Sequence, residues 1–596
     1  MSFGPGQAAV LAELCDAIVP GSVATGALEY IERAVGGMSA AEEDRLHAAI
    51  GLLSTGDLGR LTGTAAFALV RRLAIEAYYG DFTPPGYTGP TPHETIGFTP
   101  PAAAHLRKDW TFLGRPADGP APADGRGRPA TDPHWADDPY GMTTPVPDEA
   151  DIVVVGSGAG GGLIAAELGS HGHDVLVLEA GGYHPAESHT RFELGARHHL
   201  WWPTRFAETG EDCPGPVALL AGRCVGGSTV INTKVAMRAP AHDFDRWPFP
   251  ADLDYDRVER ALGVRERNDW TPSVHRLATG FAALDTKLEP VRSYTDANCT
   301  RCGACLTGCP SNAGKSALNT FLAPALANNQ VRVRTHCTVD QVLIENNRVT
   351  GVRYNGNREV RAKTVVVAAG ALNTPLILRR SNTPNANIGR YLGLHPARLV
   401  YGRFDEPQDC HRAYPITAHC LSNLSSFLVE GTTIQDPVAF AESLIDPSNR
   451  PLWGRRLHDT GQNYRHWAGL LAMANDENTG VVELGADDDA VVTKRFSETE
   501  RVRLADALAF SVAALRAAGA REVVWSGLST THVQGTARMG VDPARSVVDP
   551  TGRSHDVAGL YVGDASLVPV SLSVNPSLTV MALAARVADA LHEELT

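Results

Sequence analysis

The chain has 596 residues, with 43% hydrophobic and 20% charged side chains, a formal net charge of −14 and a pI near 5.8. This length allows several domains and a large core, and the acidic balance disfavours nucleic-acid binding, which needs a basic face. No apolar run reaches the roughly 18 residues that predict a membrane span. Residues 1–7 hold no basic stretch followed by an apolar one, so we expect no export signal and a cytoplasmic protein.

The first 112 residues are predicted to form an all-helical domain. Apolar residues between Ala8 and Val19 recur at helical spacing, and Ser39 with Glu42 makes a capping-box pattern that opens another helix. Between residues 113 and 148 the chain is rich in Pro, Gly and Asp, which is typical of a linker. We therefore expect the next domain to begin near residue 149.

Short apolar strands and helices alternate beyond the linker. The predicted elements are a strand at 152–155, a helix at 163–168, strands at 175–178 and 364–370, a strand-rich stretch at 331–352, a closing strand at 559–562 and a final helix from about 577. Apolar strands separated by helices indicate a buried parallel sheet. Shorter strands between 396 and 495 indicate an antiparallel sheet, followed by a long helix capped at Ser497. The expected fold class is α/β, or α+β overall.

A glycine-rich turn joins the first of these strands to the next helix. Residues 151–161 read Asp-Ile-Val-Val-Val-Gly-Ser-Gly-Ala-Gly-Gly. Gly156 allows a tight turn, Gly158 lets the backbone approach a pyrophosphate, and Gly161 allows close helix packing. Glu179 ends the second strand, where a carboxylate can bind ribose hydroxyls. The pattern predicts a Rossmann-like dinucleotide site but does not separate NAD from FAD, and a glycine turn that binds nothing is the alternative.

Several later segments follow one another in an order that makes the prediction more specific. They are residues 222–232 (Gly-Arg-Cys-Val-Gly-Gly-Ser-Thr-Val-Ile-Asn), 243–247, 369–375, 387–396 and 563–566. Together with the glycine turn, they resemble the glucose–methanol–choline (GMC) oxidoreductase family over about residues 150–596. The resemblance implies FAD, a discontinuous FAD-binding domain at 149–250, 331–395 and 521–596, a Cys-rich insertion at 251–330 and a substrate-binding domain at 396–520.

The resemblance also implies which residues bind FAD. Beyond the glycine turn and Glu179, the expected contacts are Arg223, Gly227, Ser228, Asn232, Val339, Asp564 and Pro576. Some relatives attach the flavin through a histidine beside the position of Asn232. Because no histidine stands there in this chain, non-covalent FAD is expected.

Two polar residues near the C-terminus are the catalytic candidates. Alcohol oxidation needs a base for the hydroxyl proton, and a near-neutral imidazole suits that task. By resemblance His532 is the base, in the segment His-Val-Gln-Gly-Thr, and Asn575 holds the substrate oxygen. The alternatives are a core histidine with backbone partners and, for Asn575 before Pro576, a helix-capping asparagine. His395 and His419 are further candidates, for which a structural role is the favoured interpretation.

Four of the ten cysteines fall within eleven residues. Cys299, Cys302, Cys305 and Cys309-Pro310 have the spacing of bacterial ferredoxins, but only one copy is present, which favours a three-cysteine [3Fe–4S] cluster over [4Fe–4S]. The chain also resembles the catalytic subunits of flavin-dependent glucose and gluconate dehydrogenases, whose cluster pattern maps onto Cys299, Cys305 and Cys309. Zinc, free thiols or a disulfide are the alternatives.

The leading hypothesis is an FAD-dependent dehydrogenase that oxidises a CH–OH group of a sugar, glycoside, polyol or other alcohol and passes electrons through a cluster to an external acceptor. A helical N-terminal segment similar to the small subunit of gluconate-type dehydrogenases supports it. The alternatives are an oxidase that uses O₂ with structural cysteines, a lyase resembling the hydroxynitrile lyases, and a non-catalytic flavoprotein. The sequence leaves the substrate and the oligomeric state open.

Overall fold

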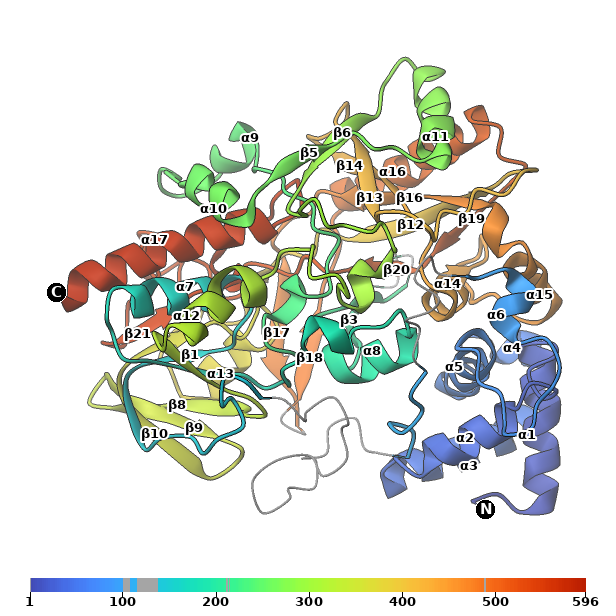
Figure 1. Ribbon diagram of the computed structural model, residues 1–596, viewed down its shortest axis with the longest axis horizontal. Helices are drawn as coiled ribbons and strands as arrows, with labels where there is room; N and C mark the ends of the chain where they lie inside the picture. Colours follow the sequence, from blue (N-terminus) through green and yellow to red (C-terminus); the bar gives the residue numbers. More distant parts are fainter. Residues whose placement is uncertain (1, 100–107, 115–137, 211–212, 214, 487–488) are drawn as a thin grey trace.

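The computed structural model describes residues 2–99, 108–114, 138–210, 213, 215–486 and 489–596 (Figure 1). Most of the predicted linker therefore lies outside the described residues. Within them, no helix is long and apolar enough to cross a membrane.

A seven-stranded sheet forms the first layer. Its order is β7(Val331–Arg334), β2(Val175–Leu178), β1(Glu149–Val155), β10(Arg358–Val367), β9(Arg348–Tyr354) and β8(Val339–Glu345), and β21(Leu560–Val562) also pairs with β10. Strands β7, β2, β1, β10 and β21 run parallel, whereas β8, β9 and β10 form an antiparallel meander. The four residues of β2 and the last four of β1 are buried, as expected for a sheet covered on both faces.

Helices cover this sheet and bring the C-terminus beside the first strand. They are α7(Ala159–Ser170), α10(Tyr255–Leu262), α12(Ala323–Ala327), α13(Thr374–Arg380) and α17(Ser577–Leu595). Helix α17 packs against α7, and the ring of His592 stacks on that of His171, the residue that follows α7, so the end of the chain lies beside the C-terminal end of α7 (Figure 1). The α/β class is confirmed.

A fourteen-stranded sheet forms the second part. Its path is β11(Arg390–Leu392), β17(Gly480–Leu484), β18(Ala490–Thr493), β3(Arg205–Glu208), β4(Val217–Leu219), β20(Leu528–Thr530), β12(Ala397–Arg403), β16(Trp467–Ala474), β14(Phe427–Thr432), β13(Ile416–Cys420), β6(Glu289–Ser293) and β5(Arg265–Arg267), with β15(Leu444–Ile445) and β19(Glu522–Ser526) at its side. The helices around it are α8(Glu193–Leu200), α9(Ala241–Phe244), α11(Pro272–Ala282), α14(Pro437–Ser443), α15(Gly454–Gln462) and α16(Glu498–Ala517). The predicted antiparallel sheet is present, and Ser497 caps α16 with Glu500 as expected.

This sheet draws strands from outside the segment 396–520 that the sequence assigned to it. Strands β5 and β6 come from the predicted Cys-rich insertion, while β3, β4, β11, β19 and β20 come from the predicted FAD-binding segments. The reason is that strands far apart in the sequence pair with one another in this sheet, and local sequence patterns do not reveal such pairs.

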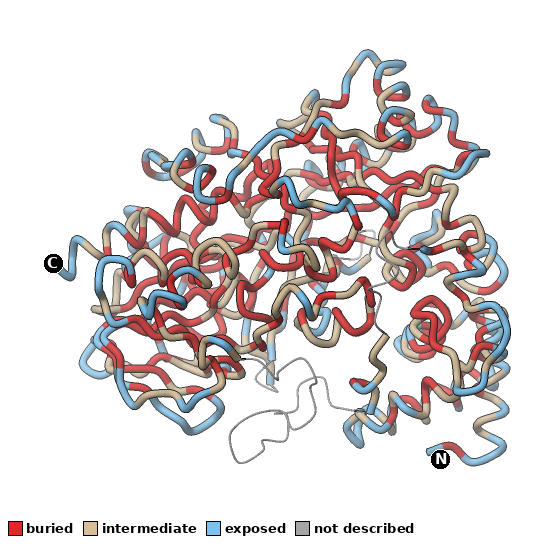
Figure 2. Tube along the Cα trace, in the orientation of Figure 1, coloured by how far each residue is buried: buried red, intermediate tan, exposed pale blue. Residues whose placement is uncertain are grey.

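Among the described residues ahead of the first strand, the α-helices are α1(Pro5–Ile18), α2(Ala27–Val35), α3(Ala40–Ser54), α4(Leu58–Leu61), α5(Ala65–Tyr79) and α6(Pro92–Ile96). Their apolar residues belong to the same buried cluster as Val400 and Trp467 of the large sheet (Figure 2). The guanidinium of Arg71 is also buried in this contact. It donates to the backbone oxygens of Leu452, Glu442 and Ala441 at 2.8, 3.1 and 2.8 Å, and burial lowers its pKa to about 10. The N-terminal helices are thus an integral part of the fold.

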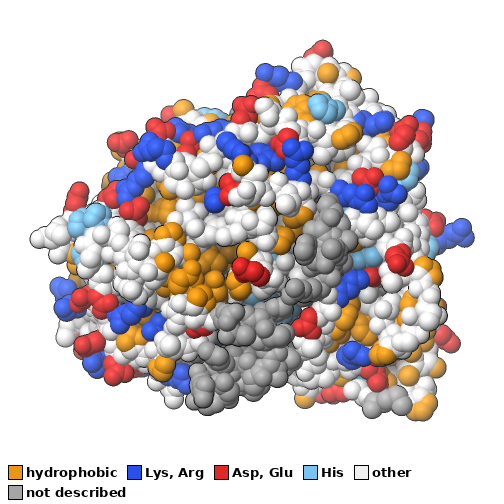
Figure 3. Space-filling view, viewed as in Figure 1, with side chains coloured by type: hydrophobic (Ala, Val, Ile, Leu, Met, Phe, Trp, Pro, Cys, Tyr) orange, Lys and Arg blue, Asp and Glu red, His pale blue; other side chains and the backbone are white. Residues whose placement is uncertain are grey.

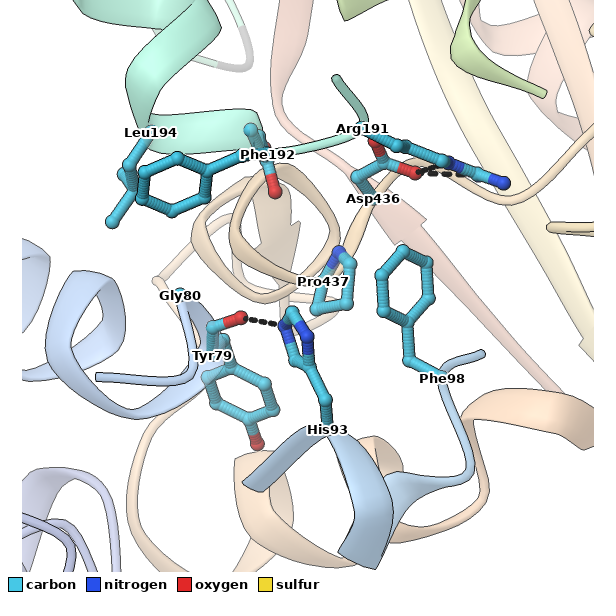
Figure 4. Close-up of a pocket in the computed structure, with 10 residues that line it drawn as sticks. Tyr79, Gly80, His93, Phe98, Arg191, Phe192, Leu194, Asp436 and Pro437 are labelled. Atoms are coloured by element: carbon cyan, nitrogen blue, oxygen red, sulfur yellow. Dashed lines mark hydrogen bonds and ion pairs between the residues drawn. The ribbon is translucent and has the colours of Figure 1, made fainter. Parts of the chain in front are cut away.

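A small cavity marks this seam (Figure 4). His93 lies on one side with its Nε2 2.7 Å from the Tyr79 oxygen, and burial lowers the His93 pKa to about 4. Arg191 and Asp436 form a buried ion pair at 2.6 Å on the other side. On the face in Figure 3, side chains of both charges are interspersed, and hydrophobic ones gather left of its centre.

Candidate active site

The glycine-rich turn has the geometry of a phosphate cradle. Gly156 has a φ of 94°, and a Cβ on Gly161 would lie 2.2 Å from the Gly156 oxygen. At Gly160 a Cβ would lie 1.8 Å from the Gly563 oxygen, so the first turn of α7 touches the strand end that carries Asp564. At Gly158 the position of a Cβ has no described protein atom within 4 Å. The helix N-terminus therefore opens onto space where an anion can bind.

The loop 222–232 closes over this turn. The Gly226 nitrogen donates to Ser157 Oγ at 3.0 Å, and a Cβ on Gly227 would lie 2.8 Å from the Gly158 Cα. Ser228 Oγ accepts from the Gly222 nitrogen at 2.9 Å, which braces the loop. The guanidinium of Arg223 lies 4.7 Å from the centre of the Trp202 ring. The structure thus brings Gly227 and Ser228 to the predicted phosphate site.

Glu179 and Asp564 are buried carboxylates whose oxygens bind protein donors. Glu179 accepts from the nitrogen and Oγ of Ser157 at 2.9 and 2.5 Å and from the Gly181 nitrogen at 2.9 Å. Asp564 accepts from the Gly370 nitrogen at 2.8 Å and from Thr374 Oγ1 at 2.5 Å, among others. Burial raises the pKa of both. Both carboxylates therefore hold the loops around the glycine-rich turn together through hydrogen bonds, in addition to any contact with a nucleotide.

His532 is paired with a second histidine. Its Nδ1 lies 3.1 Å from Nδ1 of His395, and the rings stack with centres 5.2 Å apart. Burial, and secondarily His395, keep the pKa of His532 well below its usual value, so its imidazole is neutral near pH 7. His395 is fully buried, and its φ of 47° is one that costs a non-glycine residue about 1 kcal/mol. Nδ1 of His532 therefore has another imidazole within hydrogen-bond distance.

Asn575 precedes helix α17 and does not cap it. Pro576 occupies the N-cap position, and Asn575 Oδ1 is buried without a hydrogen-bond partner among the described residues. A free, buried amide oxygen at a helix N-terminus is suited to a ligand.

Hydrogen bonds hold the segments of His395, His532 and Asn575 together. Residues Gly393 and Gln534 pair as a β-bridge, and Gln534 Oε1 accepts from the Leu572 nitrogen at 3.4 Å. Asn478 joins the same segments, since it accepts from the Ser571 nitrogen at 2.7 Å and donates to the Tyr391 oxygen at 2.8 Å. One strand-end network therefore carries both catalytic candidates.

Asn232 lies beside the same helix start. Its Nδ2 donates to the Tyr294 hydroxyl at 2.6 Å, and this hydroxyl is 3.2 Å from Oγ of Ser577, the first residue of α17. Val339, the last of the expected contacts, is buried in β8 opposite Tyr354.

Comparison with known proteins agrees with this architecture. Two family profiles, both described as GMC oxidoreductase, match residues 150–397 and 488–584. An uncharacterised GMC-type oxidoreductase of Sinorhizobium fredii, y4nJ, is 30% identical over 497 residues that cover 74% of this chain and 94% of the relative. The chain belongs to the GMC oxidoreductase family. The resemblance seen in the sequence is confirmed, and FAD is the cofactor of this GMC protein. Residues 1–149 precede both profiles, so their similarity to a dehydrogenase small subunit stays a prediction.

A more distant relative and a solved structure extend the comparison. Long-chain-alcohol oxidase FAO4A of Arabidopsis thaliana is 26% identical over 506 residues, covering 73% of this chain and 67% of the relative. The crystal structure of pyridoxine 4-oxidase from Mesorbium loti matches with a TM-score of 0.58 at 19% identity, over 75% of this chain and 99% of that one. At this identity the match shows the fold alone.

The residues present fit FAD. The accessible N-terminus of α7 at Gly158 suits the pyrophosphate, and Gly227 and Ser228 border it. The N-terminus of α17, directly after Asn575 and Pro576, carries the positive end of that helix.

The four cysteines line one cavity, together with Tyr414 and neighbouring loop residues. The buried ammonium of Lys234 lies beside it. Burial lowers the pKa of Lys234 to about 8, and the thiols of Cys305 and Cys309 oppose that shift. Arg191 ties the loop to the seam of Figure 4 by donating to the Cys302 oxygen at 2.8 Å.

These thiols do not form a ligand set in this arrangement. In the part of the chain that the structure describes, no three His, Cys, Asp or Glu side chains gather closely enough to hold a metal ion. Cys309 Sγ accepts from the Gly314 nitrogen at 3.3 Å, and burial raises the pKa of Cys305, which favours a neutral thiol. The residues share a cavity but do not converge as an iron–sulfur cluster requires.

Sequence reasoning missed three residues of this region. His395 was treated as structural, although the segment ending in His395-Pro396 is part of the family pattern. The sequence around Lys234 did not indicate that this side chain is buried, because its burial depends on the cysteine loop. Glu430 was overlooked, although a lone acid within the apolar run Phe-Leu-Val-Glu-Gly at 427–431 was a visible sign.

Proposed function

We propose that this GMC oxidoreductase oxidises a CH–OH group to a carbonyl, with His532 accepting the hydroxyl proton. The observation that carries this proposal is the His395–His532 pair, held by the same strand-end network as Asn575. Bound FAD would supply the hydride acceptor. The hydroxyl proton would go to His532 and the hydride would be taken up by that acceptor, which balances a two-electron alcohol oxidation.

The tautomers of the pair follow from this role. For Nε2 of His532 to accept the substrate proton, its Nδ1 must carry hydrogen and donate to Nδ1 of His395. His395 then fixes the ring of His532 and acts as a positioning residue. Asn575 can donate its amide hydrogen to the substrate oxygen as negative charge develops there.

The test is anaerobic mixing of the holoenzyme with a panel of primary alcohols, polyols, sugars and glycosides. At least one should bleach the flavin absorbance, and His532→Gln should slow that bleaching. If none bleaches it, while a chemical reductant does, the proposed chemistry is wrong.

Electron acceptance by O₂ is proposed for the second half of the cycle. The name of the Arabidopsis relative, an oxidase, supports this proposal, as does the lack of a gathered ligand set among the described thiols. Oxygen consumption during turnover with the bleaching alcohol tests it.

A dehydrogenase with a [3Fe–4S] or [4Fe–4S] cluster and an external acceptor is the second candidate, because Cys299, Cys302, Cys305 and Cys309 share one cavity. Iron, zinc and acid-labile sulfide analysis of anaerobically purified protein, with visible and EPR spectra, separates the two. Iron with sulfide supports the cluster, and FAD without iron excludes it. The cytoplasmic location also remains a prediction, which cell fractionation tests.

A further inference from the structure

A carboxyl group is buried in the middle of an apolar strand. Glu430 lies in β14, where it and its neighbours Val429 and Gly431 are buried, and its side chain is 0% exposed. Neither of its carboxyl oxygens has a hydrogen-bond partner among the residues that the structure describes. An isolated buried carboxyl group is unfavourable, so an unpaired one at a functional site indicates a ligand.

Glu430 faces the catalytic candidate Asn575. Burial raises the pKa of Glu430 to about 8, and the Asn575 side chain is the neighbour that opposes this shift. Asn575 is 6% exposed, and its own Oδ1 is unpaired within the described chain. The two side chains, each more than nine-tenths buried, are therefore direct neighbours just before helix α17.

The register of the large sheet shows which side chains share the face of Glu430. Glu430 pairs directly with Leu471 of β16 and with His419 of β13. Residues directly opposite one another in an antiparallel sheet point to the same face. Leu471 keeps part of its surface accessible, although β16 has neighbours on both sides. The same face therefore combines an apolar surface with one acid.

Within the described residues, no lysine, arginine or histidine acts on the pKa of Glu430. The carboxyl group therefore has no cationic partner among these residues, and the Asn575 side chain is the one donor that acts on it, so the hydrogen-bonding capacity of its two oxygens is not filled. A substrate group that donates a hydrogen bond would supply that partner while the hydroxyl to be oxidised lies at His532 and Asn575.

We propose that Glu430 is a specificity-determining residue that binds a hydrogen-bond-donating substituent of the substrate, a second hydroxyl or an amine, distinct from the CH–OH that is oxidised. This rests on the proposed alcohol oxidation. A site built to pair with a polar substituent discriminates strongly against an analogue that lacks it, because the buried polar group is then left unpaired.

The experiment compares three alcohols of equal chain length: a 1-alkanol, its α,ω-diol and its ω-amino alcohol, with three to eight carbons. Steady-state kinetics are measured for wild type, Glu430→Leu, Glu430→Gln and the control Glu483→Leu, which alters an exposed acid on β17. Glu430→Leu should lower kcat/KM for the diol or the amino alcohol by about 10- to 100-fold, chiefly through KM, and change the 1-alkanol by less than about threefold.

The two variants separate the two possible donors. Glu430→Gln keeps hydrogen bonding but cannot ionise, so it should spare the diol if the donor is a hydroxyl and lose the amino alcohol if the donor is an ammonium. An equal loss by Glu430→Leu on all three alcohols, or no loss on any, would overturn the proposal. Folding is checked by the melting temperature, which should not fall in Glu430→Leu because an apolar side chain replaces an unpaired acid.

A binding measurement tests recognition by Glu430 independently of the proposed alcohol oxidation. The 1-alkylamine of the same length has no CH–OH group, and it should raise the melting temperature of the wild-type holoenzyme more than that of Glu430→Leu. If no alcohol bleaches the flavin but this difference is seen, recognition by Glu430 stands and the proposed oxidation fails. If all three alcohols bleach it and Glu430→Leu treats them alike, the oxidation stands and recognition by Glu430 fails.

Discussion

The histidine pair and the cysteine cavity are both rich in reactive side chains, but they are built differently. His395 and His532 lie at strand ends of one sheet, 3.1 Å apart, and are fixed by backbone bridges. The four cysteines lie on one loop around a cavity and do not converge. The four cysteines are close in sequence, yet their side chains do not converge. The two histidines are 137 positions apart in the sequence, yet their ring nitrogens are in contact. Tertiary scaffolds, more than local spacing, preorganise reacting groups.

The largest expected effect tests whether the histidine pair, and not the cysteine cavity, is needed for flavin reduction. His532→Gln should slow anaerobic flavin reduction by the preferred alcohol about 100- to 10,000-fold, because the base for the hydroxyl proton is lost. Cys305→Ser should change the same rate by less than about threefold. Stopped-flow absorbance of the flavin measures both. His275→Gln, on the exposed side of α11, is the control. A large effect of Cys305→Ser on this half-reaction would place the cysteines in the reacting centre and contradict the contrast.

Substitutions at two glycines of one turn separate the effect of backbone packing from the effect of ligand binding. Gly160→Ala would place a Cβ 1.8 Å from the Gly563 oxygen, so it should destabilise the protein by about 1–3 kcal/mol and lower its FAD content. Gly158→Ala meets no described protein atom, so it should weaken FAD binding but leave the unfolding of the apoprotein unchanged. Denaturant unfolding and FAD titration check the pair. Equal destabilisation by both variants would mean that the open side of Gly158 is not a ligand site.

A smaller effect is expected from the partner histidine. Activity falls as pH drops through the pKa of His532, because only the neutral imidazole accepts a proton. Burial and His395 lower this pKa, so the acidic limb of kcat/KM should lie below about pH 6.5 in the wild type. His395→Asn removes one cause, so the limb should move to higher pH while kcat falls about tenfold. A limb that stays in place or moves down would rule out His395 as the positioning residue.

The smallest effect concerns stability. The pKa of Glu430 is about 8 in the folded protein against about 4.5 for an exposed glutamate, so the folded state binds this proton more tightly. Its contribution to stability is therefore complete below pH 4.5 and is lost as the pH rises toward 8. The melting temperature of Glu430→Gln relative to wild type should increase between pH 5 and 8. The corresponding change in the free energy of unfolding has an upper bound of about 1.4 kcal/mol per pKa unit. A difference that is constant with pH would mean that the carboxyl group does not titrate in this range.

Much of the FAD region followed from local patterns. The strand–turn–helix at residues 149–170 needs glycines at fixed offsets. The structure shows the tight turn at Gly156 and the close packing at Gly161, and it leaves the Cβ position of Gly158 open. The caps of α3 and α16 were also predictable, since a serine and a glutamate three residues apart bond to each other's backbone. These features depend on neighbours in the sequence.

Other features were not readable in this way. The sequence assigned strands β5 and β6 to an insertion and β19 to the FAD-binding segments, yet they pair in the large sheet. The site also needs partners that are distant in the chain: His395 beside His532, Asn575 facing Glu430, and Lys234 beside the cysteines.

The sequence by itself therefore determined the family, the cofactor and the phosphate-binding turn, because backbone conformation and hydrogen bonding there are set within a few residues. Only the tertiary structure decided that His532 is neutral and paired with His395, that the cysteines do not converge, and that Glu430 lies beside Asn575. These properties depend on burial and on side-chain distances between remote segments, which are fixed only when the two sheets pack together.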